Sequence, residues 1–281
     1  MKKIILVLAV VTETISVSAQ SKFEVKDFGS FKIHSYVTAD PLGDMSYIIE
    51  GKKSLVVLEP VLFHANIKEF GEYVKSLKKP IEKVIASYHT GGFNAFDPKS
   101  IVMIEGMPEF EKGEVYSGMM AYFASTFGES MDSREHGATA TVGKNEKVNW
   151  AGVDFQFFPG SVSDFPAASV LIGGKVYYLH FAPVANMHMG ALQITGREAV
   201  SAYLTELENA KKSGATLFVG GHGIGTAEMK DVDFQIAYLK NMKELISKEK
   251  SREDFIAAMK KAYPNLAAEN NLQEVAGKLY Q

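Results

Sequence analysis

Residues 54–87 read SLVVLEPVLFHANIKEFGEYVKSLKKPIEKVIAS, and this stretch decides the expected fold. Leu55–Leu58 and Ile81–Ala86 are short apolar runs of the kind that form buried strands. Between them, apolar residues recur at helical spacing over 66–77, and a proline at position 80 ends the pattern. Two strands joined by a helix at this spacing form a βαβ unit, so the sequence predicts a sheet that is layered with helices.

Strand patterns surround this unit, and helical patterns close the chain. Short apolar or alternating runs predict further strands at 31–36, 46–49, 148–158, 168–178 and 217–219. Helical spacing of apolar residues predicts one helix over 197–212 and others towards the end of the chain. Because no repeat or linker-like stretch separates these segments, we expect a single domain over 20–281 with a helical extension over about 233–281.

The composition excludes several classes of protein. The chain has 281 residues, of which 46% are hydrophobic and 22% charged, as in an ordinary soluble globular protein. It has no cysteine, which excludes disulfides, thiolate metal sites and catalytic thiols. The formal net charge of −3 gives no basic face for nucleic acid, so no nucleic-acid partner is expected. No stretch after the first twenty residues approaches the length of a membrane span.

The first residues have the pattern of an export signal. Lys2 and Lys3 precede an apolar run over 4–11, and small residues then lead to Ala19. We expect a signal peptide over 1–19 and an exported mature chain, either periplasmic or secreted. The alternative is a cytoplasmic protein whose first strand is apolar.

Three local sequences carry a resemblance to a known superfamily. The segments SYII (46–49) and LVVLEP (55–60) are similar to opening strands, and IEKVIAS (81–87) to the strand before a metal loop. FVGGHG (218–223) is similar to a Gly-His-Gly turn that holds a metal histidine. Together they resemble an exported bacterial branch of the metallo-β-lactamase superfamily. The resemblance implies an α+β fold, a four-layer αββα sandwich with added C-terminal helices, and zinc-assisted hydrolysis.

The metal motifs of that superfamily are largely missing. Its first metal loop reads His-x-His-x-Asp-His, whereas this chain reads YHTGGFN over 88–94. In one alignment the four ligand positions hold residues that are not ordinary zinc ligands: Tyr88, Thr90, Gly92 and Phe93. An alignment moved by one residue makes His89 the first ligand but fills the other positions with glycine, phenylalanine and asparagine. Neither alignment preserves the two-metal site.

Other histidines leave room for a different metal site. Ser161 stands where a Pro-Gly-His motif has its histidine, and His180 stands where the bridging aspartate is usual. Only His222 stands where the superfamily has a metal-binding histidine. If the alignment holds, His89, His180 and His222 lie at one edge of the sandwich, where three imidazoles could bind a single zinc ion. The plain alternative is that each is an isolated, hydrogen-bonded histidine.

Two functions follow from these residues. The first interpretation is an exported pseudoenzyme or non-hydrolytic binding protein that needs no cofactor. It would bind a small molecule in a pocket lined by Tyr88, Thr90, Phe93, Ser161, Asp164 and His188. The alternative is a metal-dependent hydrolase with one zinc ion on His89, His180 and His222. A third and weaker hypothesis is serine or histidine chemistry without a metal.

Overall fold

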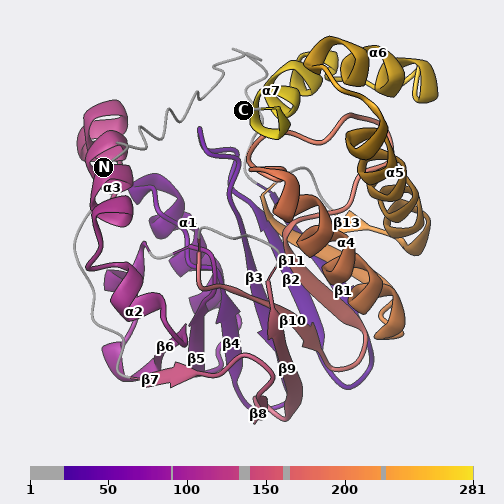
Figure 1. The fold of residues 1–281 in the computed structure, drawn as a ribbon. Helices are drawn as coiled ribbons and strands as arrows, with labels where there is room; N and C mark the ends of the chain where they lie inside the picture. Colours follow the sequence, from indigo (N-terminus) through magenta and orange to yellow (C-terminus); the bar gives the residue numbers. More distant parts are fainter. Residues whose placement is uncertain (1–21, 90, 133–139, 161–164, 223–225, 281) are drawn as a thin grey trace.

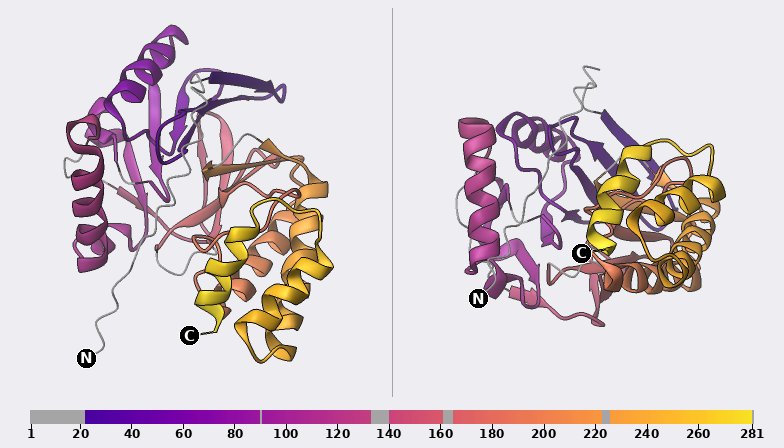
Figure 2. Two further views of the ribbon diagram at one scale, coloured as in Figure 1. Left: turned by 90° about the horizontal axis from the view of Figure 1, so that it is seen from above. Right: turned by 45° about the horizontal axis from the view of Figure 1, so that its top comes forward.

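The computed structural model describes residues 22–89, 91–132, 140–160, 165–222 and 226–280 (Figure 1). The predicted signal peptide over 1–19 lies outside these residues. Two β-sheets face each other, and helices cover the outer face of each sheet (Figure 2). This is the four-layer α+β sandwich that the sequence predicted.

The first sheet has seven strands that pair in chain order. Pairing is antiparallel as far as β4 and parallel from β4 to β7. The change occurs because the helix α1 (His64–Ser76) joins β4 to β5, which confirms the predicted βαβ unit. The strands are β1 (Lys22–Asp27), β2 (Lys32–Val37), β3 (Met45–Glu50), β4 (Leu55–Leu58), β5 (Ile81–Ala86), β6 (Ile101–Ile104) and β7 (Ala140–Val142).

The second sheet runs in the order β13-β12-β11-β10-β9-β8. Its strands are antiparallel except for β11 and β12, which are joined by the helix α4 (Arg197–Lys212) and run parallel. The carboxyl ends of these two strands therefore meet at one edge of the sheet. The strands are β8 (Lys147–Trp150), β9 (Val153–Pro159), β10 (Ala168–Ile172), β11 (Val176–Phe181), β12 (Leu217–His222) and β13 (Thr226–Ala227).

Helices flank the two sheets on opposite sides of the molecule (Figure 2). The first sheet has α1, α2 (Met107–Phe110) and α3 (Glu114–Phe127), together with single 3₁₀ turns at Phe93–Ala95, Pro98–Ser100 and Gly128–Ser130. The second has α4, α5 (Met229–Lys248), α6 (Arg252–Ala262) and α7 (Glu269–Leu279). In the part of the chain that the structure describes, no helix combines the length and the apolar character needed to cross a membrane.

Alternation along β11 divides the core into two parts. Tyr178 packs between the two sheets. Its neighbours Tyr177 and Leu179 pack in a separate hydrophobic cluster, between the second sheet and the helices α4 and α5. Because successive side chains of a strand point to opposite faces, the next residue, His180, returns to the side between the sheets. The strand thus delivers a histidine to the edge of the sandwich.

One close approach between the sheets depends on glycine. A Cβ atom on Gly51, in the turn after β3, would lie 1.8 Å from the carbonyl oxygen of Ala151, in the turn between β8 and β9. We expect Gly51→Ala to lower the free energy of unfolding by about 1–3 kcal/mol, because the backbone must shift to relieve this overlap. Gly71 in α1 has no atom within 4 Å of the same position. Gly71→Ala is the control, and it should stabilise the helix by about 0.5–1 kcal/mol. Urea unfolding measures both values, and equal midpoints for the two variants would contradict the prediction.

Candidate metal centre

Three histidines from separate segments converge at the edge of the sandwich. His89 lies three residues after the end of β5. His180 lies in β11, and His222 is the last residue of β12. One ring nitrogen from each histidine lies within 4.8 Å of the others. His180 is buried, and the other two are half-buried. The structure therefore brings together the three residues that the sequence proposed for a single metal ion.

The spacing of the nitrogens fits a zinc ion. The Nε2 atoms of His89 and His222 are 3.2 Å apart. Two nitrogens that each bind a tetrahedral zinc ion at its usual bond length lie about 3.3 Å apart. The rings of His180 and His222 have centroids 5.0 Å apart, so the third imidazole flanks the same point. Burial, and then the neighbouring His222 and His89, hold the pKa of His180 well below its ordinary value, which favours the neutral ring that a metal needs.

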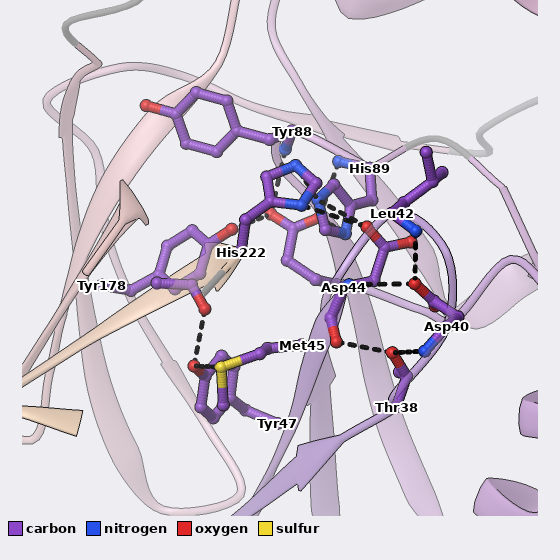
Figure 3. A network of polar contacts seen from close by, with 12 residues as sticks. Thr38, Asp40, Leu42, Asp44, Met45, Tyr47, Tyr88, His89, Tyr178 and His222 are labelled. Atoms are coloured by element: carbon purple, nitrogen blue, oxygen red, sulfur yellow. Dashed lines mark hydrogen bonds and ion pairs between the residues drawn. The ribbon is translucent and has the colours of Figure 1, made fainter. Parts of the chain in front are cut away.

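A carboxylate supports His222 from behind. Asp44, just before β3, forms an isolated β-bridge with His222, and its Oδ1 is 3.2 Å from His222 Nδ1 (Figure 3). The same oxygen is 3.9 Å from His89 Nε2. With Nδ1 facing a carboxylate and Nε2 facing the site, His222 has the arrangement of a ligand oriented by a second partner. No pattern in the sequence marked Asp44 as part of the site.

Asp44 and His222 stabilise each other's charged forms. Burial acts to raise the pKa of Asp44, but His89 and His222 outweigh it and lower the pKa. Burial acts to lower the pKa of His222, but the Asp44 carboxylate outweighs this effect, so the pKa of His222 is raised. The loop also holds Asp44 in place. The Thr38 hydroxyl donates to the Asp44 carbonyl (2.7 Å), and the Asp44 amide donates to the Asp40 carboxylate (3.1 Å) (Figure 3).

A second carboxylate ties the histidine segments together. Glu59 follows β4 with a φ of 58° and is fully buried. It accepts hydrogen bonds from the amides of Tyr88 (2.9 Å) and His89 (2.8 Å) and from the hydroxyl of Tyr178 (2.7 Å). Tyr178 lies two residues before His180 on β11. Glu59 therefore fixes the loop that carries His89 against the strand that carries His180.

Comparison with solved structures gives the fold. The metallo-β-lactamase DIM-1 aligns with a TM-score of 0.56 and 11% identity over 79% of this chain and 99% of that chain. The chain has the metallo-β-lactamase fold. FIM-1 from Pseudomonas aeruginosa, solved in a mono-zinc form, aligns with a TM-score of 0.51 and 12% identity over 79% of this chain and 96% of that one. By sequence, the chain matches no family profile and no curated protein.

A sulfatase with this fold also aligns. The sec-alkylsulfatase Pisa1 from Pseudomonas sp. has a TM-score of 0.58 and 15% identity over 88% of this chain. The alignment spans only 46% of that protein. The similarity to the β-lactamases and the sulfatase shows a shared metallo-β-lactamase fold, and identities this low say nothing about substrate.

The predicted pocket residues of this metallo-β-lactamase fold have different positions. Tyr88 stacks on His180 and thus lies at the centre. Phe93 is buried in the core between the sheets, and His188 is buried with its Nδ1 2.9 Å from the Tyr238 hydroxyl of α5. Neither belongs to the histidine group. Three further residues lie outside the described part of the chain: Thr90, Ser161 and Asp164.

Aromatic rings lie against His180 and His222. Phe181 lies against His180 and His222, with ring centroids 4.4 and 5.3 Å away. Phe165 meets His180 edge-on at 6.4 Å. Apolar surroundings of this kind strengthen electrostatic interactions with a bound ion, because they limit screening by water.

We expect Asp44→Asn to weaken zinc binding about 10–100-fold, because the amide no longer supplies the negative charge behind His222. Competition with a chromophoric chelator measures the dissociation constant. Asp40→Asn is the matched control, because its remaining oxygen can still accept the amide hydrogen bonds of Leu42 and Asp44. Asp40→Asn also removes a negative charge that acts on His222, so an equal loss of affinity in both variants would mean that the direct contact between Asp44 and His222 does not determine the affinity.

Proposed function

We propose that this chain is a metal-dependent hydrolase with one zinc ion on His89, His180 and His222. One observation carries this proposal: the Nε2 atoms of His89 and His222 are 3.2 Å apart, and the second ring is backed by the Asp44 carboxylate. It is the alternative that the sequence analysis kept beside the binding protein. A hydrogen bond between two imidazoles would also give the 3.2 Å distance, but the proposal is favoured because a third histidine from a separate strand brings a ring nitrogen within 4.8 Å of the other two.

The proposed centre holds a single metal. The superfamily's first metal loop would supply further ligands, but Tyr88, Gly92 and Phe93 stand at three of its ligand positions. Tyr88 and Phe93 are buried among apolar groups, and Gly92 has no side chain. Three imidazoles with a free fourth position match catalytic zinc sites of the three-histidine type.

Bound zinc would supply a Lewis acid that polarises a substrate oxygen and makes water more acidic. The residues of the chain prepare the site for it. Asp44 Oδ1 lies 3.2 Å from His222 Nδ1, a position that would favour a proton on Nδ1 and leave the lone pair of Nε2 for the metal. Burial keeps His180 neutral for the same purpose. The half-buried rings of Phe165 and Phe181 add apolar contacts to His180.

The second candidate is the non-hydrolytic binding protein of the first interpretation. The aromatic rings around His180 favour it, because they offer apolar contacts to a small molecule. Export also stays a prediction. N-terminal sequencing of the protein recovered outside the cytoplasm would test it, with cleavage after Ala19 expected.

Zinc content and turnover test the function together. The purified protein is equilibrated with zinc, freed of excess metal and analysed by plasma mass spectrometry, with about one zinc ion per chain expected. Ester, lactam, phosphodiester and sulfate-ester substrates are then assayed before and after chelation. Turnover that disappears on chelation and returns with zinc supports the hydrolase. Absence of bound zinc overturns it, and bound zinc without any turnover favours the binding protein.

A further inference from the structure

His180 differs from His222 in how its ring is held. The Nδ1 atom of His180 is buried and has no hydrogen-bond partner among the residues that the structure describes. His222, in contrast, has the Asp44 carboxylate 3.2 Å from its Nδ1. A histidine that binds a metal is usually oriented by a hydrogen bond to its second nitrogen. The Nδ1 atom of His89 is likewise without a hydrogen-bond partner among the described residues, so ring contacts are what can orient these two imidazoles there.

The ring of Tyr88 supplies such a contact. It is parallel to the imidazole of His180, with an interplanar angle of 1° and centroids 4.1 Å apart. Both side chains are buried, Tyr88 to 5% exposure and His180 to 8%. The ring of Phe181 also approaches His180, with centroids 4.4 Å apart and an interplanar angle of 51°. A flat ring on one face of the imidazole restricts rotation about its χ2 angle.

Tyr88 is itself held along its whole length. Its amide donates to Glu59, and its hydroxyl passes beside Gly160, where a Cβ atom would lie 2.2 Å from the phenol oxygen. Beyond that point lies Glu206 of α4, which is buried and accepts a hydrogen bond from Ser169. Burial, and then the charge of Glu206, raise the pKa of Tyr88, so the phenol stays protonated near this carboxylate. The amide of Tyr88 is therefore fixed by Glu59, and its phenol oxygen lies in a space that is open only because residue 160 is glycine.

We propose that Tyr88 is a positioning residue that aligns His180 for metal binding by ring stacking. The inference rests on the proposed metal centre. Without the tyrosine ring, His180 samples several χ2 angles, and the metal must select the one that completes the site. That selection lowers the apparent affinity by the fraction of time that the ring spends in the right orientation.

Two substitutions separate the ring from the hydroxyl. Tyr88→Leu removes the stacking and should weaken zinc binding about 10–100-fold, the range found when a ligand loses its orienting partner. Tyr88→Phe keeps the ring, so its affinity for zinc should stay within about threefold of that of the original protein. Phe70→Leu is the control for a lost buried aromatic ring, because Phe70 of α1 is buried in the same core. It should lower stability without changing the affinity for zinc.

A metal-free measurement keeps this proposal separate from the hydrolase. Nuclear magnetic resonance of the full chain labelled with ¹⁵N-histidine should show sharp, ring-current-shifted His180 signals in the original protein and in Tyr88→Phe. In Tyr88→Leu, the shift should be lost and the signals should broaden. Unchanged His180 signals in Tyr88→Leu overturn the proposal, as does Tyr88→Phe losing as much zinc affinity as Tyr88→Leu. A protein that binds no zinc but shows these shifts contradicts the hydrolase while supporting the alignment of His180.

Discussion

Replacing His222 with alanine is expected to remove stoichiometric zinc from the protein. His222 provides one of the three imidazoles and is the one that Asp44 orients, so its loss leaves two ligands and an unpaired buried carboxylate. The affinity should fall by more than the roughly 10–100-fold typical of an outer partner. Plasma mass spectrometry of the purified variant measures the metal, and a chelator competition gives the dissociation constant.

His180→Ala should have a similar effect, and His64→Ala should have none. His64 is an exposed histidine at the start of α1 and controls for weak surface binding of zinc. Melting temperatures with and without zinc give an independent check, because a ligand that binds only the folded state raises stability. If His222→Ala retains one zinc ion per chain, the three histidines are not the metal ligands.

Periodic patterns in the sequence explain why much of the fold could be predicted. The runs at Leu55–Leu58 and Ile81–Ala86 and the helix between them are local, and their parallel pairing follows from the length of the connection. His222 could be placed because FVGGHG over 218–223 resembles the superfamily's Gly-His-Gly turn after a strand. These features need only neighbouring residues, which the sequence shows directly.

The contacts of the site depend on residues far apart in the chain. Asp44 meets His222 through an isolated bridge between segments that are distant in sequence, and no local pattern marks this pairing. His89 was a candidate ligand only in one of two alignments of a degraded motif, and its ring meets His222 through a contact between segments distant in sequence. Phe93 was expected at the pocket, although a large apolar side chain gains more by entering the core, where the structure places it.

Glu59 was also missed, because a glutamate after a strand usually indicates only the end of an apolar run. In the structure it is the shared acceptor for two backbone amides and one phenol, all within a buried region. A positive φ at a residue other than glycine is uncommon, and here it turns the carboxylate towards the His89 loop. The structural role of Glu59 thus comes from three distant donors that converge on it.

We therefore expect Glu59→Gln to destabilise the protein by about 2–4 kcal/mol, even without metal. One carboxylate oxygen serves Tyr88 and Tyr178, and the other serves His89. The glutamine amide replaces one of these acceptors with a donor, so a buried N–H group loses its partner.

Glu82→Gln is the matched control. Glu82 also accepts from a backbone amide and a hydroxyl, of Ala151 and Ser54, but it is exposed to water, and its change should cost under about 1 kcal/mol. Urea unfolding of both variants gives the comparison, and equal losses would mean that burial of Glu59 does not determine its contribution.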